Sequence, residues 1–299
     1  MSATRITPMV GERKKSRKST TALMHLVLGG TALIWLGPVL FALYTAFRPY
    51  ADTADNGYLG IAQTLTLDNF STALGELPTF YVNTAIITLP ALVVTLLFAS
   101  FIAYIVSRYS FRFNLPLLVL FTACNLLPQQ VIIIPLFEWF NQWPLPQWLG
   151  GGDYGVWFDS YFGLIMIHIA FQTGFCTFVL SNYMKTLPKE LDEAARVDGA
   201  GVIRHFFTII LPLCRPALAA LATLEFTWIY NDFFWAATLM TTGDKLPITS
   251  AINNFKGEFF TDTNLIAAGS LLIAIPTMVV YFALQKQFIG GLTLGANKG

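Results

Sequence analysis

The segment MKTLPKELDEAARVDGAGVIRHFFTIILPLCRP, residues 184–216, separates two long apolar runs of the chain. It carries too many charges to lie within a bilayer, because a charged side chain at the membrane centre is costly. Its first half places apolar side chains on one helical face, namely Leu187, Leu191, Ala194 and Ala195. Gly199 supplies a sharp turn after this face. The pattern predicts a short amphipathic helix that ends at a glycine.

A second amphipathic stretch follows the glycine and ends at Pro212. Its expected apolar side comprises Val202, Ile203, Phe206, Phe207 and Ile210. Two interpretations of the resulting helix pair remain open on physical grounds. In the first, the small Ala-rich face lets another protein approach closely, and the rigid bend transmits the movement of that protein to the neighbouring spans. In the second, the pair is an interfacial hairpin that lies on the membrane surface.

Outside this loop the chain is strongly apolar. Hydrophobic types make up 55% of its 299 residues and charged types 12%, whereas soluble domains carry roughly 25% charged residues. A membrane span needs about 20 apolar residues. Six such runs occur, at about 22–47, 83–106, 115–137, 161–182, 216–240 and 265–284. Pro128 and Pro135 are expected to kink the third run. We therefore expect an all-α integral membrane protein with six transmembrane helices.

This expectation divides the chain into three parts. A basic N-terminal tail occupies residues 1–21, the six-helix domain with its loop at 184–216 occupies 22–284, and a C-terminal tail occupies 285–299. Of the 18 lysines and arginines, only Arg48, Lys245 and Lys256 lie on the side opposite to the N-terminal tail. Because cytoplasmic loops carry the excess of basic residues, we expect both termini and the 184–216 loop in the cytoplasm, and the chain in the cytoplasmic (inner) membrane.

Three short motifs in the loop carry a resemblance to a known family. They have the order and spacing of the EAA loop of ABC importer permeases: Glu193-Ala194-Ala195, Asp198-Gly199-Ala200 and Ile210-Leu211-Pro212. Further matches lie at 67–70 (LDNF), 230–233 (YNDF) and 287–299. Over nearly its whole length the chain resembles the maltose-type carbohydrate permeases of bacteria, which are inner-membrane components of binding-protein-dependent transport. Tyr230, where that family usually has Trp, and Asn297, where Val is common, are similar to its glucose- or mannose-type subset.

The resemblance implies a coupling role for the loop, which would dock in a groove of a cytoplasmic ATPase subunit. The residues that would couple the chain to this ATPase are Glu193, Ala194, Ala195, Asp198, Gly199 and Pro212, and the tail residues that would reach it are Gly291, Gly295 and Lys298. The implied partners are a second homologous permease, two ATPase subunits, an extracytoplasmic sugar-binding protein and the lipid bilayer, and no nucleic acid. ATP and Mg²⁺ would be bound by the ATPase, so this chain would bind no cofactor.

Polar residues inside the apolar runs are the candidates for a substrate path, because burying them in a membrane is costly. A sugar needs neutral hydrogen-bonding groups beside aromatic faces, which suggests Asn125, Gln129, Gln130, Gln172, Tyr230 and Asn231. Such residues also join helices by hydrogen bonds, and this interpretation stays open for each of them. Glu225 is expected to pair with a neighbouring helix or with the partner permease rather than with sugar.

Patterns for catalysis and nucleotide binding are missing from the sequence. No GxxxxGK[ST] motif occurs, and the letters GxGxxG at 150–155 follow no expected strand. No metal-ligand pattern or nucleophile–base set is found, so we expect no enzyme. An ion-coupled secondary transporter is the alternative, and it would be expected to show internal repeats and midplane ion sites. The resemblance to the carbohydrate permeases implies a permease subunit of an ATP-driven importer that moves a monosaccharide such as glucose or mannose, or a short oligosaccharide, by alternating access.

Overall fold

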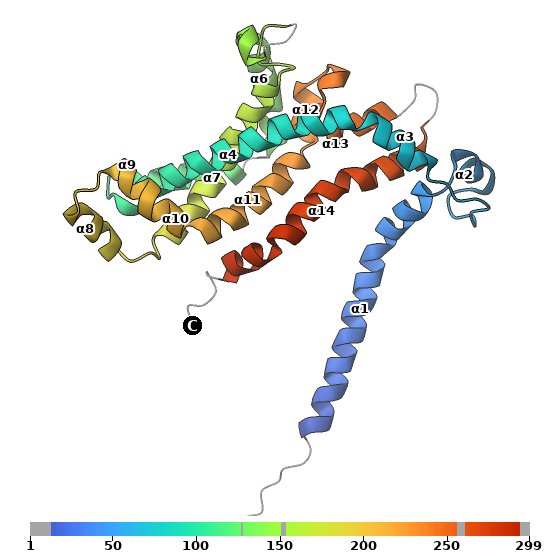
Figure 1. Ribbon diagram of the computed structural model, residues 1–299, viewed down its shortest axis with the longest axis horizontal. Coiled ribbons are helices and arrows are strands. Elements are labelled where there is room, and N and C mark those ends of the chain that lie inside the picture. The colour runs from blue at the N-terminus through green and yellow to red at the C-terminus, as the bar shows by residue number, and fades with distance from the viewer. Residues whose placement is uncertain (1–12, 127, 151–153, 256–260, 294–299) are drawn as a thin grey trace, which may run out of the picture.

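The computed structural model describes residues 13–126, 128–150, 154–255 and 261–293. Within these ranges the named elements are helical, and an isolated β-bridge joins Pro144 to Val156. Four long helices build the bundle: α4 (Pro78–Arg108), α7 (Tyr161–Met184), α11 (Arg215–Tyr230) and α14 (Thr263–Thr293). α4 packs along α7 and on α11, and α11 packs against α14 (Figure 1). The expected all-α class is confirmed.

The spans agree with five of the six expected apolar runs. In the described part of the chain, four helices are long and apolar enough to cross a bilayer: Thr20–Ala46, Pro78–Arg108, Tyr161–Met184 and Thr263–Gln285. A fifth span arises if the pair Val202–Leu213 and Arg215–Leu239, which bends by 75°, is taken as one. This pair covers the fifth expected run, 216–240, except for its last residue.

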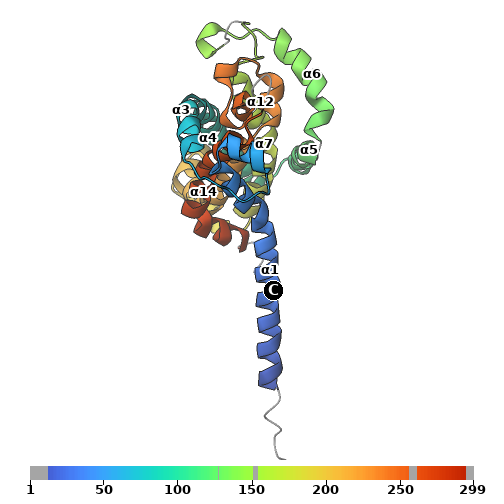
Figure 2. The same ribbon diagram turned by 90° about the vertical axis from the view of Figure 1, so that its right-hand side faces the viewer.

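The expected third run, 115–137, does not form one helix. The structure divides it into α5 (Asn114–Leu126) and α6 (Gln129–Gln142). Pro128 adopts an extended conformation with φ −62° and ψ 131°, and a proline in a helix interior removes a backbone hydrogen bond and clashes with the preceding turn. The third run is therefore interrupted at Pro128, where a kink was expected, and continues through Pro135. It forms two shorter helices, which curve around one flank of the bundle (Figure 2).

α1 (Arg13–Ala46) projects away from the bundle (Figure 1). Its side chains are exposed from Thr20 to Phe41, although the segment is apolar. Such an apolar surface suits lipid or another membrane protein. α1 also begins inside the expected tail 1–21, and α14 continues to Thr293, past the expected boundary at residue 284.

The two ends of the bundle carry different short elements. We call the end with α8 (Glu190–Val197) and α9 (Val202–His205) the loop end. We call the opposite end the far end. Its elements are α2 (Tyr50–Asn56), α3 (Asp68–Glu76), η1 (Gln147–Leu149), α12 (Phe234–Leu239), η3 (Gly243–Lys245), α13 (Ile248–Ala251) and η4 (Ile252–Phe255).

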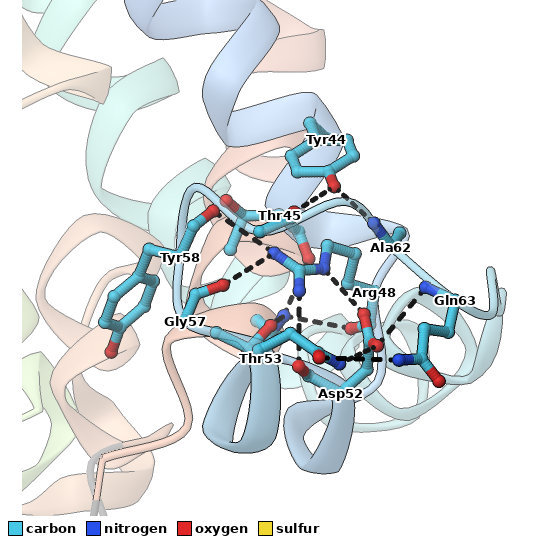
Figure 3. A network of polar contacts seen from close by, with 12 residues as sticks. Tyr44, Thr45, Arg48, Asp52, Thr53, Gly57, Tyr58, Ala62 and Gln63 are labelled. Carbon is cyan, nitrogen blue, oxygen red and sulfur yellow. Dashed lines mark hydrogen bonds and ion pairs between the residues drawn. The ribbon is translucent and has the colours of Figure 1, made fainter.

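A network of polar contacts fixes the far end of α1 (Figure 3). Arg48 is buried, and its Nε donates to Asp52 Oδ2 at 2.8 Å. Its Nη1 donates to the carbonyl groups of Gly57 and Tyr58, both at 3.1 Å. One guanidinium group therefore folds α2 and the segment after it back onto the end of α1.

Two asparagines connect this network to distant helices. Asn264, in the first turn of α14, donates to the carbonyl groups of Thr45 (2.9 Å) and Arg48 (3.0 Å). Asn69, in α3, donates to the carbonyl groups of Ala46 (2.9 Å) and Arg48 (2.8 Å). The last carbonyl groups of a helix have no partner within that helix, so these amides complete the end of α1 and join it to α3 and α14.

The segment between α12 and α13 is held against the start of α7. Asp159 accepts hydrogen bonds from the backbone N–H groups of Thr241 (2.8 Å) and Thr242 (3.0 Å). Lys245 Nζ lies 3.7 Å from the same carboxylate. This contact fixes the elements that form one wall of the cavity described below.

Candidate functional site

A cavity of about 600 Å³ opens between α6, α7, α11 and α12. Three of the expected path residues, Gln129, Gln172 and Asn231, line it. The other lining side chains are mostly aromatic: Phe171, Trp228, Phe233, Phe234 and Trp235, with His168, Thr227 and Asp232. Amide groups beside aromatic surfaces form a site suited to an uncharged polar molecule, because a few polar groups orient a ligand in a largely apolar pocket.

Two ionisable side chains lie in the wall of this cavity. His168 Nε2 is 3.8 Å from Asp232 Oδ2, so α7 and the end of α11 face each other there. The Asp232 carboxylate also accepts hydrogen bonds from the backbone N–H groups of Trp235 (3.4 Å) and Ala236 (3.2 Å). It therefore caps the first turn of α12, where a negative charge is favourable. Asp232 thus holds α12 in place as a wall of the cavity.

Aromatic pairs in the wall and directly behind it come from different helices. The rings of Phe171 (α7) and Trp235 (α12) have centroids 5.2 Å apart. Those of Phe175 (α7) and Trp228 (α11) are 5.3 Å apart. Such tilted ring pairs add specific geometry to apolar burial, so they fix the distance between α7 and its two neighbours around the cavity.

The other three expected path residues lie elsewhere. Tyr230 is buried and its hydroxyl donates to the carbonyl group of Ile273 at 2.9 Å, so its side chain points to α14. Asn125 is exposed and donates to a carbonyl group one turn earlier in α5. Gln130 is exposed. None of the three belongs to the described lining of the cavity.

Glu225 contacts a neighbouring helix, in agreement with the expectation from sequence. Its buried carboxylate accepts a hydrogen bond from Cys176 Sγ at 3.1 Å. Cys176 lies one turn after Gln172 on α7, and Glu225 lies one turn before Trp228 on α11. The contact therefore joins the two helices directly beneath the cavity.

The aromatic lining was absent from the expected path residues, although part of it had a sequence signal. Trp228 lies three residues before Asn231, and side chains at this spacing share a helix face. Phe171 is adjacent to Gln172. Phe234 reaches the cavity only because Asp232 starts a new helix there, which no periodicity in the sequence indicates.

The 184–216 loop folds into the expected helix pair at the loop end. After α8 and α9 come a π-helical turn, η2 (Phe206–Ile210), and α10 (Leu211–Leu213). Gly199 separates α8 from α9 with φ +69°, a left-handed conformation that glycine adopts readily. The expected bend at this glycine is confirmed. The first helix, however, begins at Glu190 and not at the apolar residue Leu187.

We call the segment from α8 to η2, residues 190–210, the hairpin. Most of the expected coupling residues are accessible on it. Four of them are exposed, namely Glu193, Ala194, Asp198 and Gly199. Ala195 is buried against the bundle, and Pro212 is half-buried in α10. The hairpin therefore has one face on the bundle and one free face that could receive a partner.

The apolar side of the second stretch is narrower than expected. Phe206 and Ile210 are buried, whereas Val202, Ile203 and Phe207 are between 45% and 65% exposed. The π-helical turn is wider than an α-helical one, with i→i+5 hydrogen bonds. Of the five side chains on the expected apolar side, two pack on the bundle and three remain exposed.

The C-terminal residues expected to reach an ATPase are placed only in part. Gly291 lies in the last turns of α14, and Gly295 and Lys298 lie outside the described residues. Over the ranges that the structure covers, no group of three or more His, Cys, Asp or Glu residues could hold a metal ion.

Comparison with known proteins identifies the class that this fold and loop define. The profile of the family described as "Binding-protein-dependent transport system inner membrane component" matches residues 95–292. The chain belongs to this family of ABC transporter permeases, and it is a non-catalytic permease subunit of the inner membrane. This membership decides between the two classes of transporter considered above, in favour of the binding-protein-dependent importer.

Individual relatives cover nearly the whole chain. The galactooligosaccharides transport system permease protein GanQ of Bacillus subtilis (strain 168) is 32% identical over 300 residues, which cover 97% of this chain and 100% of GanQ. The maltodextrin transport system permease protein MdxG of the same organism is 30% identical over 278 residues, which cover 92% of this chain and 95% of MdxG.

The fold is also similar to that of a solved transporter. The crystal structure of a bacterial ABC transporter involved in the import of the acidic polysaccharide alginate contains a chain that superposes with a TM-score of 0.70. The identity is 23%, and the match covers 94% of this chain and 100% of that chain. This likeness supports the permease fold.

Proposed function

We propose that the chain is the permease subunit of an ATP-driven importer that moves a short oligosaccharide across the inner membrane by alternating access. The cavity between α7, α11 and α12 carries this proposal, because it combines the amides of Gln172 and Asn231 with the aromatic surface of Trp228. Such a lining suits a neutral, hydroxyl-rich molecule. The names of GanQ and MdxG, which refer to galactooligosaccharides and maltodextrin, support the same substrate class.

A monosaccharide such as glucose or mannose is the second candidate substrate. It rests on the similarity of Tyr230 and Asn297 to the glucose- or mannose-type permeases. Tyr230 faces α14 and not the cavity, and Asn297 lies outside the described residues. The oligosaccharide therefore has the stronger support.

The proposed assembly contains this chain, a second homologous permease, two cytoplasmic ATPase subunits and an extracytoplasmic sugar-binding protein. ATP and Mg²⁺ bind to the ATPase subunits.

The distribution of basic residues supports placing the loop end and both termini in the cytoplasm. The exposed face of α8, with Glu193 and Ala194, then docks on an ATPase subunit, and the tail from Gly291 to Lys298 reaches the same subunits. Closure of the ATPase pair moves the loop, and the two permeases rock to expose the cavity inward.

Uptake by the complete complex in proteoliposomes tests this function. Galactooligosaccharide, maltodextrin, glucose and mannose would be offered in turn, with and without ATP. Gln172→Ala and Trp228→Ala are each expected to raise KM about three- to tenfold, the loss of roughly one hydrogen bond or one aromatic contact. Gln130→Ala is the matched control, because this glutamine is exposed and lies outside the cavity lining.

The outcomes separate the parts of the proposal. ATP-dependent uptake of an oligosaccharide with a raised KM in the two cavity variants supports it as stated. Uptake of glucose or mannose alone would replace the substrate but keep the mechanism. Uptake that continues without ATP would contradict the importer mechanism itself.

A further inference from the structure

An ion pair and a hydrogen bond join the hairpin at the loop end, together with the segment that leads into it, to the last turn of α4. Arg108 Nη1 lies 3.2 Å from Asp192 Oδ2 in α8, and it also donates to the carbonyl group of Leu187 at 3.3 Å. The side chains of Arg108 and Asp192 are only 5% and 15% exposed. One guanidinium group therefore contacts both α8 and the segment that leads into it.

The second half of the hairpin is fastened to α4 one turn earlier. The hydroxyl of Tyr104 and Nδ1 of His205 in α9 are 2.8 Å apart. His205 Nε2 lies 3.3 Å from Asp192 Oδ1. Asp192 therefore sits between a side chain of α4 and a side chain of α9. Since Tyr104 and Arg108 are four residues apart, both contacts come from one face of α4.

Apolar packing strengthens this junction. The ring of Phe206, in the π-helical turn, has its centroid 5.3 Å from that of Phe101 and 5.3 Å from that of Tyr104. Phe206 is buried, whereas Glu193 and Asp198 are exposed. The buried face of the hairpin thus rests on α4, and the free face points away from it.

The other end of α4 is fastened to the far end of the bundle. Asn83 Nδ2 donates to the carbonyl groups of Asp244 (2.7 Å) and Leu246 (3.1 Å), and Asn83 Oδ1 accepts a hydrogen bond from the Tyr161 hydroxyl at 2.8 Å. One residue later, Thr84 Oγ1 accepts from the backbone N–H of Ile248 at 2.8 Å. α4 is helical from Pro78 to Arg108, and the 25 residue steps from Asn83 to Arg108 correspond to about 38 Å.

We propose that α4 connects the coupling hairpin to the far-end segment 244–248, with Arg108 and Asp192 as the positioning residues that join hairpin and helix. A displacement of α8, applied at its exposed face, is transmitted through the buried Arg108–Asp192 pair to α4. α4 then transmits it to segment 244–248, which lies beside the cavity wall. A contiguous chain of packed and hydrogen-bonded groups is the physical requirement for such coupling. The inference rests on the proposed function, because the displacement comes from the ATPase.

The test uses the complete complex in proteoliposomes, with ATP hydrolysis and sugar uptake measured on the same sample. Galactooligosaccharide is the probe, or whichever of the four sugars above gives uptake. Arg108→Met and Asp192→Asn are each expected to lower the amount of sugar moved per ATP at least fivefold while ATP hydrolysis continues. Asn83→Ala, at the opposite end of α4, is expected to lower the same ratio. Arg112→Met is the matched control, since Arg112 is exposed near the same end of α4.

The exchange of the two charges separates positioning from a merely structural role. Arg108→Asp combined with Asp192→Arg is expected to restore the ratio to within twofold of wild type. An unchanged ratio in both single variants, or no restoration in the double variant, overturns the proposal. If the Arg108 variants fail to assemble, Asp192→Asn keeps the size of the side chain and removes its charge, and an unchanged ratio in that variant overturns the proposal. Failure of the proposed function would look different, because wild type itself would then show no ATP-dependent uptake.

Discussion

Arg48 Nε and Asp52 Oδ2 lie 2.8 Å apart, and both side chains are buried where α1 ends and α2 begins. The hydrogen bond from Arg48 holds the pKa of Asp52 below its ordinary value of 3.8. Further hydrogen bonds to this carboxylate come from the Gln63 backbone N–H and the Asn56 amide. The charged form of Asp52 is therefore the form that the fold requires.

The pH dependence of stability follows from this pair. The pKa of Asp52 is lower in the folded than in the unfolded chain, so the pair stabilises the fold above about pH 3.8, and this contribution is lost as the pH falls through the folded pKa. Asp52→Asn is expected to lower the thermal midpoint at pH 7, and the difference from wild type should shrink below pH 4. Thermal unfolding in detergent across this pH range measures it. Asp55→Asn, an exposed neighbour on α2, is the control, and equal midpoints for wild type and Asp52→Asn at pH 7 would refute the prediction.

Asn264 is expected to contribute to stability through its buried amide. Asn264→Ala removes the hydrogen bonds to the carbonyl groups of Thr45 and Arg48, which then lie buried without this partner. The expected loss is about 1–3 kcal/mol in the free energy of unfolding. Denaturant titration of the purified chain measures it. Asn141→Ala, an exposed asparagine that donates within its own helix, should stay within about 0.5 kcal/mol of wild type.

The bend at Gly199 is expected to be specific for glycine. An added Cβ would meet no atom within 4 Å, so the only penalty of Gly199→Ala is the left-handed backbone at φ +69°. This penalty of about 1–2 kcal/mol corresponds to a 5- to 30-fold smaller population of the bent hairpin. Uptake should fall accordingly while membrane insertion is kept. Gly201→Ala offers the same open space at φ −67° and should transport normally; equal uptake by the two variants would argue against the role of the bend.

The close approach of α5 to α7 depends on Gly174. A Cβ at this position would lie 2.6 Å from Asn125 Nδ2 and 2.9 Å from the Phe121 carbonyl oxygen. Gly174→Ala is expected to displace α5 and to destabilise the chain by about 1–3 kcal/mol, the usual effect of overpacking. The free energy of unfolding measures this change. Gly75→Ala has no atom within 4 Å of the new Cβ and should not destabilise.

The features that sequence predicted well depend on local composition. The runs at 83–106, 161–182 and 265–284 correspond to α4, α7 and α14, because the length and hydropathy of a span are properties of its own residues. The glycine bend of the loop was predictable for the same reason. Its position between two amphipathic stretches leaves little choice of conformation.

Other features depend on contacts between distant residues. The sequence showed the proline at 128, but not whether neighbouring helices would tolerate it inside one span. Gln172 and Asn231 meet at a cavity, whereas Tyr230, beside Asn231, turns toward α14. The direction of each side chain follows from how α7, α11 and α14 pack, and that packing has no local signature.

The contact between Asn264 and the carbonyl group of Arg48 joins positions 216 residues apart in the chain. During synthesis α3 follows α1 closely, so the Arg48 carbonyl group meets the Asn69 amide early, and α14 adds the Asn264 amide only when translation is nearly complete. A chain that stops before α14 keeps the Asn69 contact but lacks the Asn264 amide, which joins the end of α1 to the last helix. The network around Arg48 therefore distinguishes a completed permease from a truncated one at the moment of biogenesis.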